Sequence, residues 1–406
     1  MKFIADGYDI QDAINKALVV CPKKSTFDNM TTLYIKAVEG QDVAVCAVSM
    51  TDYIRAYIRA DVLEEGAVMI SRGEIEKVYK IDNLVTVEAH NDMFTMSNGK
   101  KRRTVHTYEM SSGTNETESN FLHWSIGKND FSEIFLSCNC GDFLAALEKL
   151  KDFTGNDAKK LIYTGFHLNS ARHMIEACNG YAAAWKRLDA GWYSNQDLIL
   201  THTILPMMKK IASTKRDKRE DISFYIGEYG NMKLVKITGE NYEYYTSRYE
   251  GEYINLEKSI GGLETNYLVT VDADDVSDVA QDFINSSQEA LTKGVFVAAD
   301  KQYGFAVAIN ASDFRGIEIV DGSNTSRAID DRVIVRINPI YLKTAMDFFK
   351  KERVYISIKS NTAPIIITNE EDIYDVDDLA FILPARYHAV EIDTISGMFD
   401  DLISGR

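Results

Sequence analysis

The feature that most constrains the fold is a sequence pattern that occurs three times. VMISRGEIEKVYKI begins at Val68, LILTHTILPMMKKI at Leu198 and VIVRINPIYLKTAM at Val333. In each copy an apolar, strand-like run is followed by a polar residue and then by apolar residues at helical spacing. Because self-similarity at a fixed period indicates tandem structural units, the three copies predict a repeat of one structural unit.

A second pattern, made of a short strand, an acidic turn and a helix, precedes each copy of the first. Its copies cover residues 3–20, 134–153 and 267–284. Ile10, Phe143 and Val276 occupy the same place in it and are each 133 positions apart (143 − 10 and 276 − 143). The first pattern has nearly the same spacing, so three units fill the chain to about residue 387.

Capping residues mark where the second helix of each unit begins. Ser71 opens a capping box, and Asn338 precedes a proline at the first helical position. In the middle unit either Thr201 or Thr203 can cap. Between the two helices of each unit lie alternating strands with hairpin turns, typical of an antiparallel sheet with one covered face. We therefore expect an α+β fold made of three tandem copies of a two-helix, antiparallel-sheet module.

Composition is that of a soluble globular protein. The 406 residues are 45% hydrophobic and 26% charged. No apolar run approaches the length that spans a bilayer, and the first residues lack the features of a signal peptide. The five cysteines are few and odd in number, as in a cytosolic protein with free thiols. We expect a cytoplasmic protein with no membrane contact, no metal and no cofactor.

The net charge and the absence of catalytic motifs limit the classes of function that the chain can have. A net charge of −16 argues on average against nucleic acid, although an acidic exterior with a basic interior face would give the same sum. No phosphate loop, zinc-protease or nucleophile-elbow motif is present, so no enzymatic activity is expected. The acidic run at 272–275 fits the N-cap and first turn of a helix better than a metal site.

Five segments carry a resemblance to a known family. They are MKFIADGYDIQDAINKAL at the start, SMTDYIRAYI from Ser49, FHLNSARHMIEACNGYAAAW from Phe166, EGEYINLEKSI from Glu250 and FILPARY from Phe381. Their order, spacing and threefold repetition resemble the bacterial sliding clamp, the β subunit of DNA polymerase III. The resemblance covers residues 1 to about 387. It implies domains at 1–130, 131–262 and 263–387, followed by a C-terminal extension at 388–406.

The resemblance implies a ring with no chemistry of its own. Clamps of this family are head-to-tail homodimers whose domains enclose duplex DNA, with helices lining the hole. They tether the replicative polymerase in the bacterial cytosol or nucleoid. Sliding requires weak contacts to phosphates rather than to bases, and long basic side chains on the inner helices meet that need. The candidate DNA-binding residues are Lys16, Lys23, Lys24, Arg72, Lys77, Lys149, Lys151, Lys209, Lys210, Lys215, Arg216, Lys343, Lys350 and Lys351.

The resemblance also implies a pocket for short linear motifs of the polymerase, the clamp loader and repair proteins. The matching positions are Leu168, Cys178, Gly180, Tyr181, Ala182, Ala183, Ile254, Lys258, Ser259, Ala363, Phe381, Leu383 and Pro384. Three residues depart from the usual pattern: Asn179 replaces Asp, Ala182 replaces Arg, and Ile254 replaces Pro. The other interpretation is that these positions are simply core and domain-boundary residues.

For closure of the dimer, the resemblance places Phe283 and Ile284 at an exposed helix end, facing a partner strand that contains Thr104 and Val105. The extension at 388–406 has apolar residues at helical spacing. It is either a short packed or frayed extension or a self-inhibiting segment that docks on its own ring, for example in the peptide pocket. The alternative function is a diverged, clamp-like peptide-binding adaptor with a private partner set that does not encircle DNA.

Overall fold

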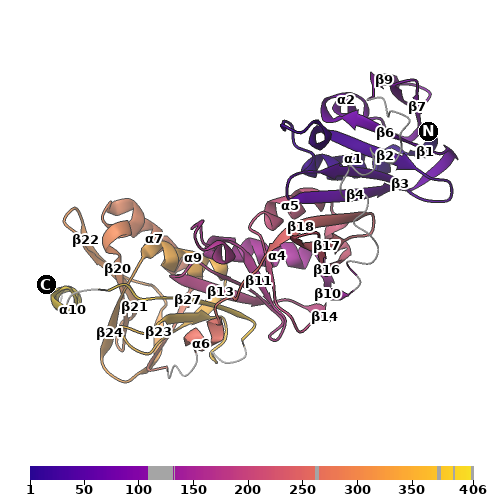
Figure 1. Cartoon of the computed structure of the whole chain (residues 1–406). Coiled ribbons are helices and arrows are strands. Elements are labelled where there is room, and N and C mark those ends of the chain that lie inside the picture. The colour runs from indigo at the N-terminus through magenta and orange to yellow at the C-terminus, as the bar shows by residue number, and fades with distance from the viewer. Residues whose placement is uncertain (108–130, 132, 261–264, 373–375, 387–388, 404–406) are drawn as a thin grey trace. The chain divides into compact units, whose positions relative to one another are not determined.

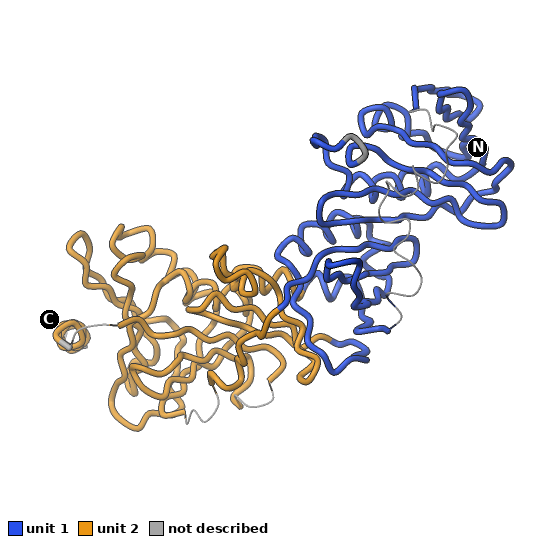
Figure 2. The backbone as a smooth tube through the Cα atoms, viewed as in Figure 1, with its two compact units in different colours: residues 1–145, 189–250 blue, residues 146–188, 251–406 orange. Residues whose placement is uncertain are grey.

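The computed structural model describes residues 1–107, 131, 133–260, 265–372, 376–386 and 389–403. The chain forms two compact units, residues 1–145 with 189–250 (unit 1) and residues 146–188 with 251–406 (unit 2), shown in Figure 2. Among the helices of the described residues, none has the length and apolar character needed to cross a bilayer.

The strands of the described residues fall into three runs of nine, one for each predicted module. Module 1 comprises β1 (Lys2–Asp6), β2 (Thr32–Ala37), β3 (Val43–Val48), β4 (Asp52–Ile58), β5 (Ala60–Glu64), β6 (Gly66–Ser71), β7 (Leu84–His90), β8 (Met93–Ser97) and β9 (Arg102–His106). Module 2 comprises β10 (Ile134–Asn139), β11 (Phe166–Asn169), β12 (Met174–Cys178), β13 (Ala182–Arg187), β14 (Ala190–Trp192), β15 (Leu198–Leu200), β16 (Asp221–Tyr229), β17 (Met232–Thr238) and β18 (Tyr242–Tyr249). Module 3 comprises β19 (Tyr267–Asp272), β20 (Val295–Asp300), β21 (Gly304–Asn310), β22 (Arg315–Ile319), β23 (Asn324–Ala328), β24 (Arg332–Ile337), β25 (Arg353–Ile358), β26 (Ile365–Thr368) and β27 (Asp378–Ile382).

Strand pairing repeats from module to module. The first strand of each module pairs antiparallel with the fifth and the seventh: β1 with β5 and β7, β10 with β14 and β16, and β19 with β23 and β25. The first helix of each module also begins with the same backbone hydrogen bond, to the residue just before the seventh strand. The donor and acceptor residues are Gly7 and Asn83 (2.7 Å), Cys140 and Glu220 (2.9 Å), and Ala273 and Glu352 (3.0 Å). The predicted threefold repeat and α+β class are thus confirmed. The predicted boundaries after residues 130 and 262 lie in or next to segments outside the described residues and stay predictions.

Each module has two main helices. The first helices are α1 (Gly7–Val20), α4 (Cys140–Leu150) and α7 (Ala273–Ser286), and the second helices are α2 (Arg72–Val78), α5 (Ile204–Ile211) and α9 (Pro339–Phe348). Two predicted caps are confirmed. Ser71 Oγ accepts from the N–H of Glu74 at 3.2 Å, and Asn338 Oδ1 accepts from the N–H of Ile340 at 2.9 Å. Thr203 holds the N-cap position of α5 without a side-chain bond.

Sheets run continuously from one module into the next. In unit 1 the strand orders are β5-β1-β7-β8-β9 and β6-β2-β3-β4-β18-β17-β16-β10-β14. In unit 2 they are β11-β12-β13-β27-β26-β25-β19-β23 and β22-β21-β20-β24. The fourth strand of one module therefore pairs with the ninth strand of the next, as β4 with β18 and β13 with β27. We call these two contacts internal junctions. The ninth strand β9 and the fourth strand β22 are edges within the described residues.

The main helices cover one face of these sheets. In unit 1, α1 packs on β3 and β4 and against α5, burying Ile10, Ile14 and Ala17 (Figure 1). In unit 2, α7 packs along α9. Burying one apolar face of each helix against one face of a sheet gives every module its own core. The polar faces of the helices stay on the outside of this layer.

The C-terminal extension folds as α10 (Ala389–Ile403), which packs on the sheet β22-β21-β20-β24. Ile395 and Phe399 are buried against Phe296, Ala298 and other small or apolar residues of that sheet. Two ion pairs to β24 accompany this contact, Arg332 with Asp400 and Arg336 with Glu391. The prediction of a packed extension is therefore confirmed. Within the described residues, two further short α-helices are α6 (Leu256–Ile260) and α8 (Ala290–Lys293).

Candidate functional site

Most of the predicted DNA-binding side chains lie on exposed or half-exposed surface. Lys23 and Lys24 follow α1, and Lys350 and Lys351 follow α9. Three others pair with an acid one turn away, because opposite charges at this spacing meet on a helix surface. These are Lys77 with Glu74, Lys151 with Glu148 and Lys343 with Asp347. Such exposed pairs are weak, so the lysines stay available to a phosphate.

The densest basic surface follows α5 in unit 1. Lys209 and Lys210 are exposed in the last turn of α5, and Lys215 and Arg216 are exposed just beyond it. Sequence reasoning missed two further exposed residues in the adjoining turn, Lys218 and Arg219. The signal was present, because residues 215–219 read KRDKR. We call the set Lys209, Lys210, Lys215, Arg216, Lys218 and Arg219 the α5 basic cluster.

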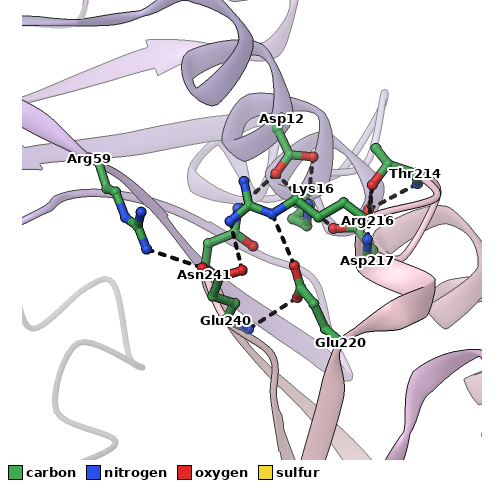
Figure 3. A network of polar contacts seen from close by, with 9 residues as sticks. All are labelled: Asp12, Lys16, Arg59, Thr214, Arg216, Asp217, Glu220, Glu240 and Asn241. Atoms are coloured by element: carbon green, nitrogen blue, oxygen red, sulfur yellow. Dashed lines mark hydrogen bonds and ion pairs between the residues drawn. The ribbon is translucent and has the colours of Figure 1, made fainter.

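Lys16 does not fit the prediction of a DNA-binding residue. Its side chain is only 1% exposed. Its ammonium group donates to the carboxylate of Asp12 at 2.6 Å and to that of Asp217 at 2.9 Å (Figure 3). Asp217 also accepts from the N–H and hydroxyl of Thr214. A lysine enclosed by two carboxylates and withdrawn from water cannot reach a phosphate, so it serves the internal junction between modules 1 and 2.

A second, exposed layer of charges lies over the Lys16 site. Arg216 pairs with Glu240 at 2.7 Å and with Glu220 at 3.4 Å, and Arg59 reaches Glu240 at 3.1 Å (Figure 3). Glu240 belongs to the turn between β17 and β18, whereas Arg59 follows β4. The Arg59–Glu240 pair therefore also connects modules 1 and 2, whereas both Arg216 pairs lie within module 2 and hold Glu240 in place. Arg216 consequently has a structural role beside any contact with DNA.

Two other predicted DNA-binding residues make structural contacts. The Arg72 guanidinium donates to the carbonyl oxygens of Leu18 and Cys21 at the end of α1, because those helix-terminal acceptors lack partners within the helix. Lys149 approaches Glu352 at 3.5 Å and Asp378 at 3.9 Å. Its side chain keeps about a third of its surface exposed. Both residues thus hold elements together as well as carrying positive charge.

The residues predicted for the peptide pocket divide into a buried and an exposed group. Leu168, Cys178, Ala182, Ala183 and Phe381 are buried. Strand pairing joins three of them directly, with Cys178 opposite Ala183 and Ala183 opposite Phe381. These five positions form the sheet at the second internal junction. For these five residues the interpretation as core and domain-boundary residues is therefore correct. Ala182 is buried, so it offers no exposed side chain in place of the usual arginine.

The exposed group contains an apolar surface. Tyr181 is 61% exposed and its ring stacks on Tyr341 at 5.7 Å. The backbone carbonyl of Tyr181 accepts from the N–H of Leu383, whose side chain is 39% exposed. Tyr341 and its exposed neighbour Ile340 begin α9 and were missed, because helical spacing alone did not mark them as surface residues. We call Tyr181, Tyr341, Ile340 and Leu383 the apolar surface of unit 2.

Of the other predicted pocket residues, Gly180 and Pro384 adjoin this surface in the chain, whereas the rest lie on other segments. Pro384 follows Leu383 and lines a cavity of about 670 Å³ together with Asn361, Thr362, Ala385, Arg386, Ile392 and Asp393. Gly180 is exposed next to Tyr181, and Ala363 is half-buried next to Thr362. Ile254, Lys258 and Ser259 lie on or just before α6. The first turn of α10 thus borders the cavity, while the rest of that helix packs on the sheet.

The residues predicted for dimer closure are partly misplaced. Phe283 was expected to be exposed, but it is only 4% exposed and packs edge-to-face on Phe314 of its own chain. Ile284 beside it is half-exposed. On β9, Thr104 is exposed and Val105 is buried, as alternation on a sheet with one covered face requires. The exposed part of the helix end is therefore Ile284 with its polar neighbours.

Within the described residues, no group of three or more His, Cys, Asp or Glu side chains could hold a metal ion. All five cysteines are free and buried. Asp275, Asp278 and Asp282 form an exposed acidic stripe along α7, the helix in which the sequence shows acids and no lysine. Of these acids, Asp282 is the one whose matching places on α1 and α4 hold lysines, Lys16 and Lys149.

The threefold module, the continuous sheets and the helix layer define the DNA clamp fold. Comparison with solved structures shows the same fold. The chain matches a putative DNA polymerase III β subunit from Eubacterium rectale with a TM-score of 0.75 at 16% identity, covering 95% of this chain and 99% of that one. It matches DNA polymerase III subunit β from Pseudomonas aeruginosa with a TM-score of 0.75 at 13% identity, and that from Borrelia burgdorferi with 0.73 at 13%. These two matches cover 95% and 96% of this chain and 100% of the other.

Comparison of sequences gives no corresponding match. No protein-family model and no curated protein matches the chain. A chain that keeps the clamp fold at such low identity is a strongly diverged clamp-fold protein. The fold is shared along almost the whole length of both chains.

Proposed function

We propose that this protein is a sliding clamp. Two copies close head-to-tail around duplex DNA and tether a DNA polymerase, and the protein carries out no reaction itself. The observation that carries the proposal is the pairing rule of the modules. Fourth strands pair with ninth strands at both internal junctions, and β22 and β9 are the fourth and ninth strands left at edges. If β22 of each copy pairs with β9 of the other, the backbone N–H and C=O groups of both edge strands gain partners and the assembly closes into a ring.

Basic side chains support contact with DNA. The α5 basic cluster is exposed, and Lys23, Lys24, Lys350 and Lys351 extend the same charge on other modules. Flexible lysines contact phosphates without reading bases, and this allows a ring to slide. Lys16 does not contribute because it is buried, and Arg72 and Lys149 contribute charge beside their structural contacts.

The apolar surface of unit 2 supports a peptide-binding role. Exposed aromatic and aliphatic side chains next to a cavity suit an extended linear motif, which places its apolar residues in such depressions. We infer that the polymerase, the clamp loader and repair proteins bind there through short motifs. This inference and the cytoplasmic location rest on the resemblance to bacterial clamps. The buried Ala182 and the exposed Ile254 make the motif preference differ from the usual one.

The test is topological. Protein is loaded on nicked circular plasmid by a bacterial clamp loader, separated from free protein by gel filtration, and then treated with a restriction enzyme that cuts once. We expect the protein to stay with the circle and to leave after cutting, because a closed ring slides off a free end. Plasmid lacking the restriction site serves as the control. Equal retention on circular and linear DNA would refute encirclement.

The alternative function is a peptide-binding adaptor that does not encircle DNA. The apolar surface of unit 2 favours it, since that surface needs no ring. The adaptor predicts binding of partner peptides with no DNA retention in the plasmid experiment. Loss of retention on cutting therefore distinguishes the two functions.

A further inference from the structure

The first helix of each module carries a charged residue at the same place. Lys16, Lys149 and Asp282 each lie nine residues after the first helical residue, which makes the matching hydrogen bond in every module. Lys16 and Lys149 are directed to the internal junctions, where they contact the next module. Asp282, on α7, has the opposite charge. It is exposed and makes no ion pair within the described residues.

At the second internal junction three charges meet. Asp378, the first residue of β27, lies opposite Lys186 of β13, and the Lys186 ammonium donates to its carboxylate at 2.8 Å. Lys149 from α4 approaches the same carboxylate at 3.9 Å. The side chain of Asp378 is almost fully buried. One acid on the ninth strand is thus held between a lysine on the fourth strand and a lysine on the helix.

At the first internal junction a tyrosine replaces the acid. Tyr242, the first residue of β18, lies opposite Ala56 of β4. The Lys16 ammonium lies 5.9 Å from the centre of the Tyr242 ring. The helix residue, the fourth-strand residue and the ninth-strand residue therefore meet at both junctions, although the side chains differ.

The corresponding ninth-strand residue in module 1 is Lys101, just before β9. The turn that leads into the ninth strand closes with the same backbone bond in two modules. Asn98 N–H donates to Lys101 C=O at 3.1 Å, and Gly239 N–H donates to Tyr242 C=O at 3.0 Å. Lys101 is exposed and forms no ion pair within the part of the chain that the structure describes.

The corresponding fourth-strand residue in module 3 is Glu318 of β22. It is found by following the strand registers from the N-cap of the second helix. In module 1, successive cross-strand partners lead from Val68 on β6 through Ile35 and Val45 to Ala56 on β4. In module 3, the same steps lead from Val335 on β24 through Val297 and Val307 to Glu318 on β22. Both paths start three residues before the capping residue. Glu318 is exposed, again without an ion pair among the described residues.

We propose that the contact between copies is a charge-inverted version of the second internal junction. Lys101 of one copy is held between Glu318 and Asp282 of a second copy, as Asp378 is held between Lys186 and Lys149 within the chain. This inference rests on the proposed ring, and it names the side chains that select its closing contact. Each of the three charges has the opposite sign to its counterpart inside the chain.

The inversion gives the ring a physical means of selecting the correct pairs. Every fourth strand has the backbone to pair with every ninth strand, so strand pairing alone does not fix which modules meet. Placing Glu318 and Asp282 against Asp378 would bring three carboxylates together, and placing Lys186 and Lys149 against Lys101 would bring three ammonium groups together. Like charges in contact disfavour both wrong pairings. Of the four pairings between these two fourth strands and these two ninth strands, only β22 with β9 and β13 with β27 leave all charges matched.

The experiment uses full-length chains and sedimentation velocity at low salt. Variant one is Lys101→Glu, and variant two carries Asp282→Lys with Glu318→Lys. We expect each variant alone to dimerise at least about tenfold more weakly than the wild type, because like charges then face each other at both contacts of its dimer. A one-to-one mixture is expected to regain dimers. In a head-to-tail heterodimer, one contact is wild type and the other has its signs exchanged but matched.

Two single substitutions control for charge alone. Asp275→Lys changes an exposed acid on the same helix α7, and Lys301→Glu changes an exposed lysine after β20. Both are expected to dimerise as the wild type does. Variants that dimerise as tightly as these controls, or a mixture that stays monomeric, would overturn the inverted junction and leave the ring intact. Wild-type chain that stays monomeric at tens of micromolar would overturn the ring itself.

Discussion

Lys16 shows how a residue of the expected type can serve structure instead of DNA. Its ammonium is buried between Asp12 and Asp217, so removing it leaves two carboxylates with no counter-charge. We predict that Lys16→Ala lowers the free energy of unfolding by about 3 kcal/mol, as expected when one partner of a buried ion pair is lost. Lys23→Ala, at an exposed position after α1, should change it by less than about 0.5 kcal/mol. Urea denaturation followed by circular dichroism measures both, and equal effects would contradict this role.

The cysteines permit a second prediction at the residue scale. Burial raises the pKa of the Cys21 thiol to about 11 and that of Cys46 to about 12. Cys140 is similarly raised to about 12. Because the thiolate is the reactive form, native protein should react with Ellman's reagent at pH 8 at least about 100-fold more slowly than protein in guanidinium. A fast-reacting thiol in the native state would contradict the burial.

The role of Lys16 could not be predicted from its sequence neighbourhood. One turn of helix connects it to Asp12, but its other partner lies 201 positions away in the chain. Periodicity identifies helices and their caps because both depend on nearby residues, as Ser71 and Asn338 illustrate. Contacts across a junction depend on which strands pair. For the same reason Phe283 was wrongly expected at the surface, since Phe314 covers it from a later hairpin.

At the scale of elements, the packing of α10 on its sheet can be tested by changing one buried side chain. Phe399 inserts among small residues of the sheet, and the Arg332 guanidinium lies 4.7 Å from its ring centre. We predict that Phe399→Ala increases amide hydrogen exchange throughout 389–403 by about 100-fold, because losing a buried phenyl ring costs about 3 kcal/mol. Val390→Ala, at a position 73% exposed, is the matched control and should leave exchange unchanged. Unchanged exchange in the Phe399 variant would show that the ion pairs alone hold the helix.

The helical spacing in this extension was visible in the sequence, whereas its docking surface was not. Ile392, Ile395, Met398 and Phe399 do face the sheet, but Leu402 is 44% exposed. The receiving surface includes Ala298, Ala306 and Ala308 on two strands, beside the larger Phe296 and Ile334. Alanine at alternate strand positions is not by itself a binding signal, because it becomes a depression only when neighbouring strands carry larger residues. Docking of a helix therefore had to be observed in the structure.

At the scale of the whole molecule, the net charge of −16 must be reconciled with binding around DNA, because both partners are negatively charged. Attraction must come from local surface such as the α5 basic cluster, so equilibrium binding to DNA should be weak and steeply dependent on salt. Retention on a circle has another origin. A closed ring is held by its own closure, and phosphate contacts only modulate sliding.

These two sources of binding are separable by experiment. We predict that Lys209→Gln, Lys210→Gln and Lys215→Gln together reduce the slope of log affinity against log salt, for a short linear duplex, by about one unit per lost phosphate contact. Retention of loaded protein on nicked circular plasmid should change little. Fluorescence anisotropy measures the slope and gel filtration measures retention. Lys301→Gln, which removes a charge far from α5 in the sequence, should leave both unchanged. If the triple variant instead loses the circle while remaining dimeric, electrostatic attraction rather than encirclement holds the protein on DNA.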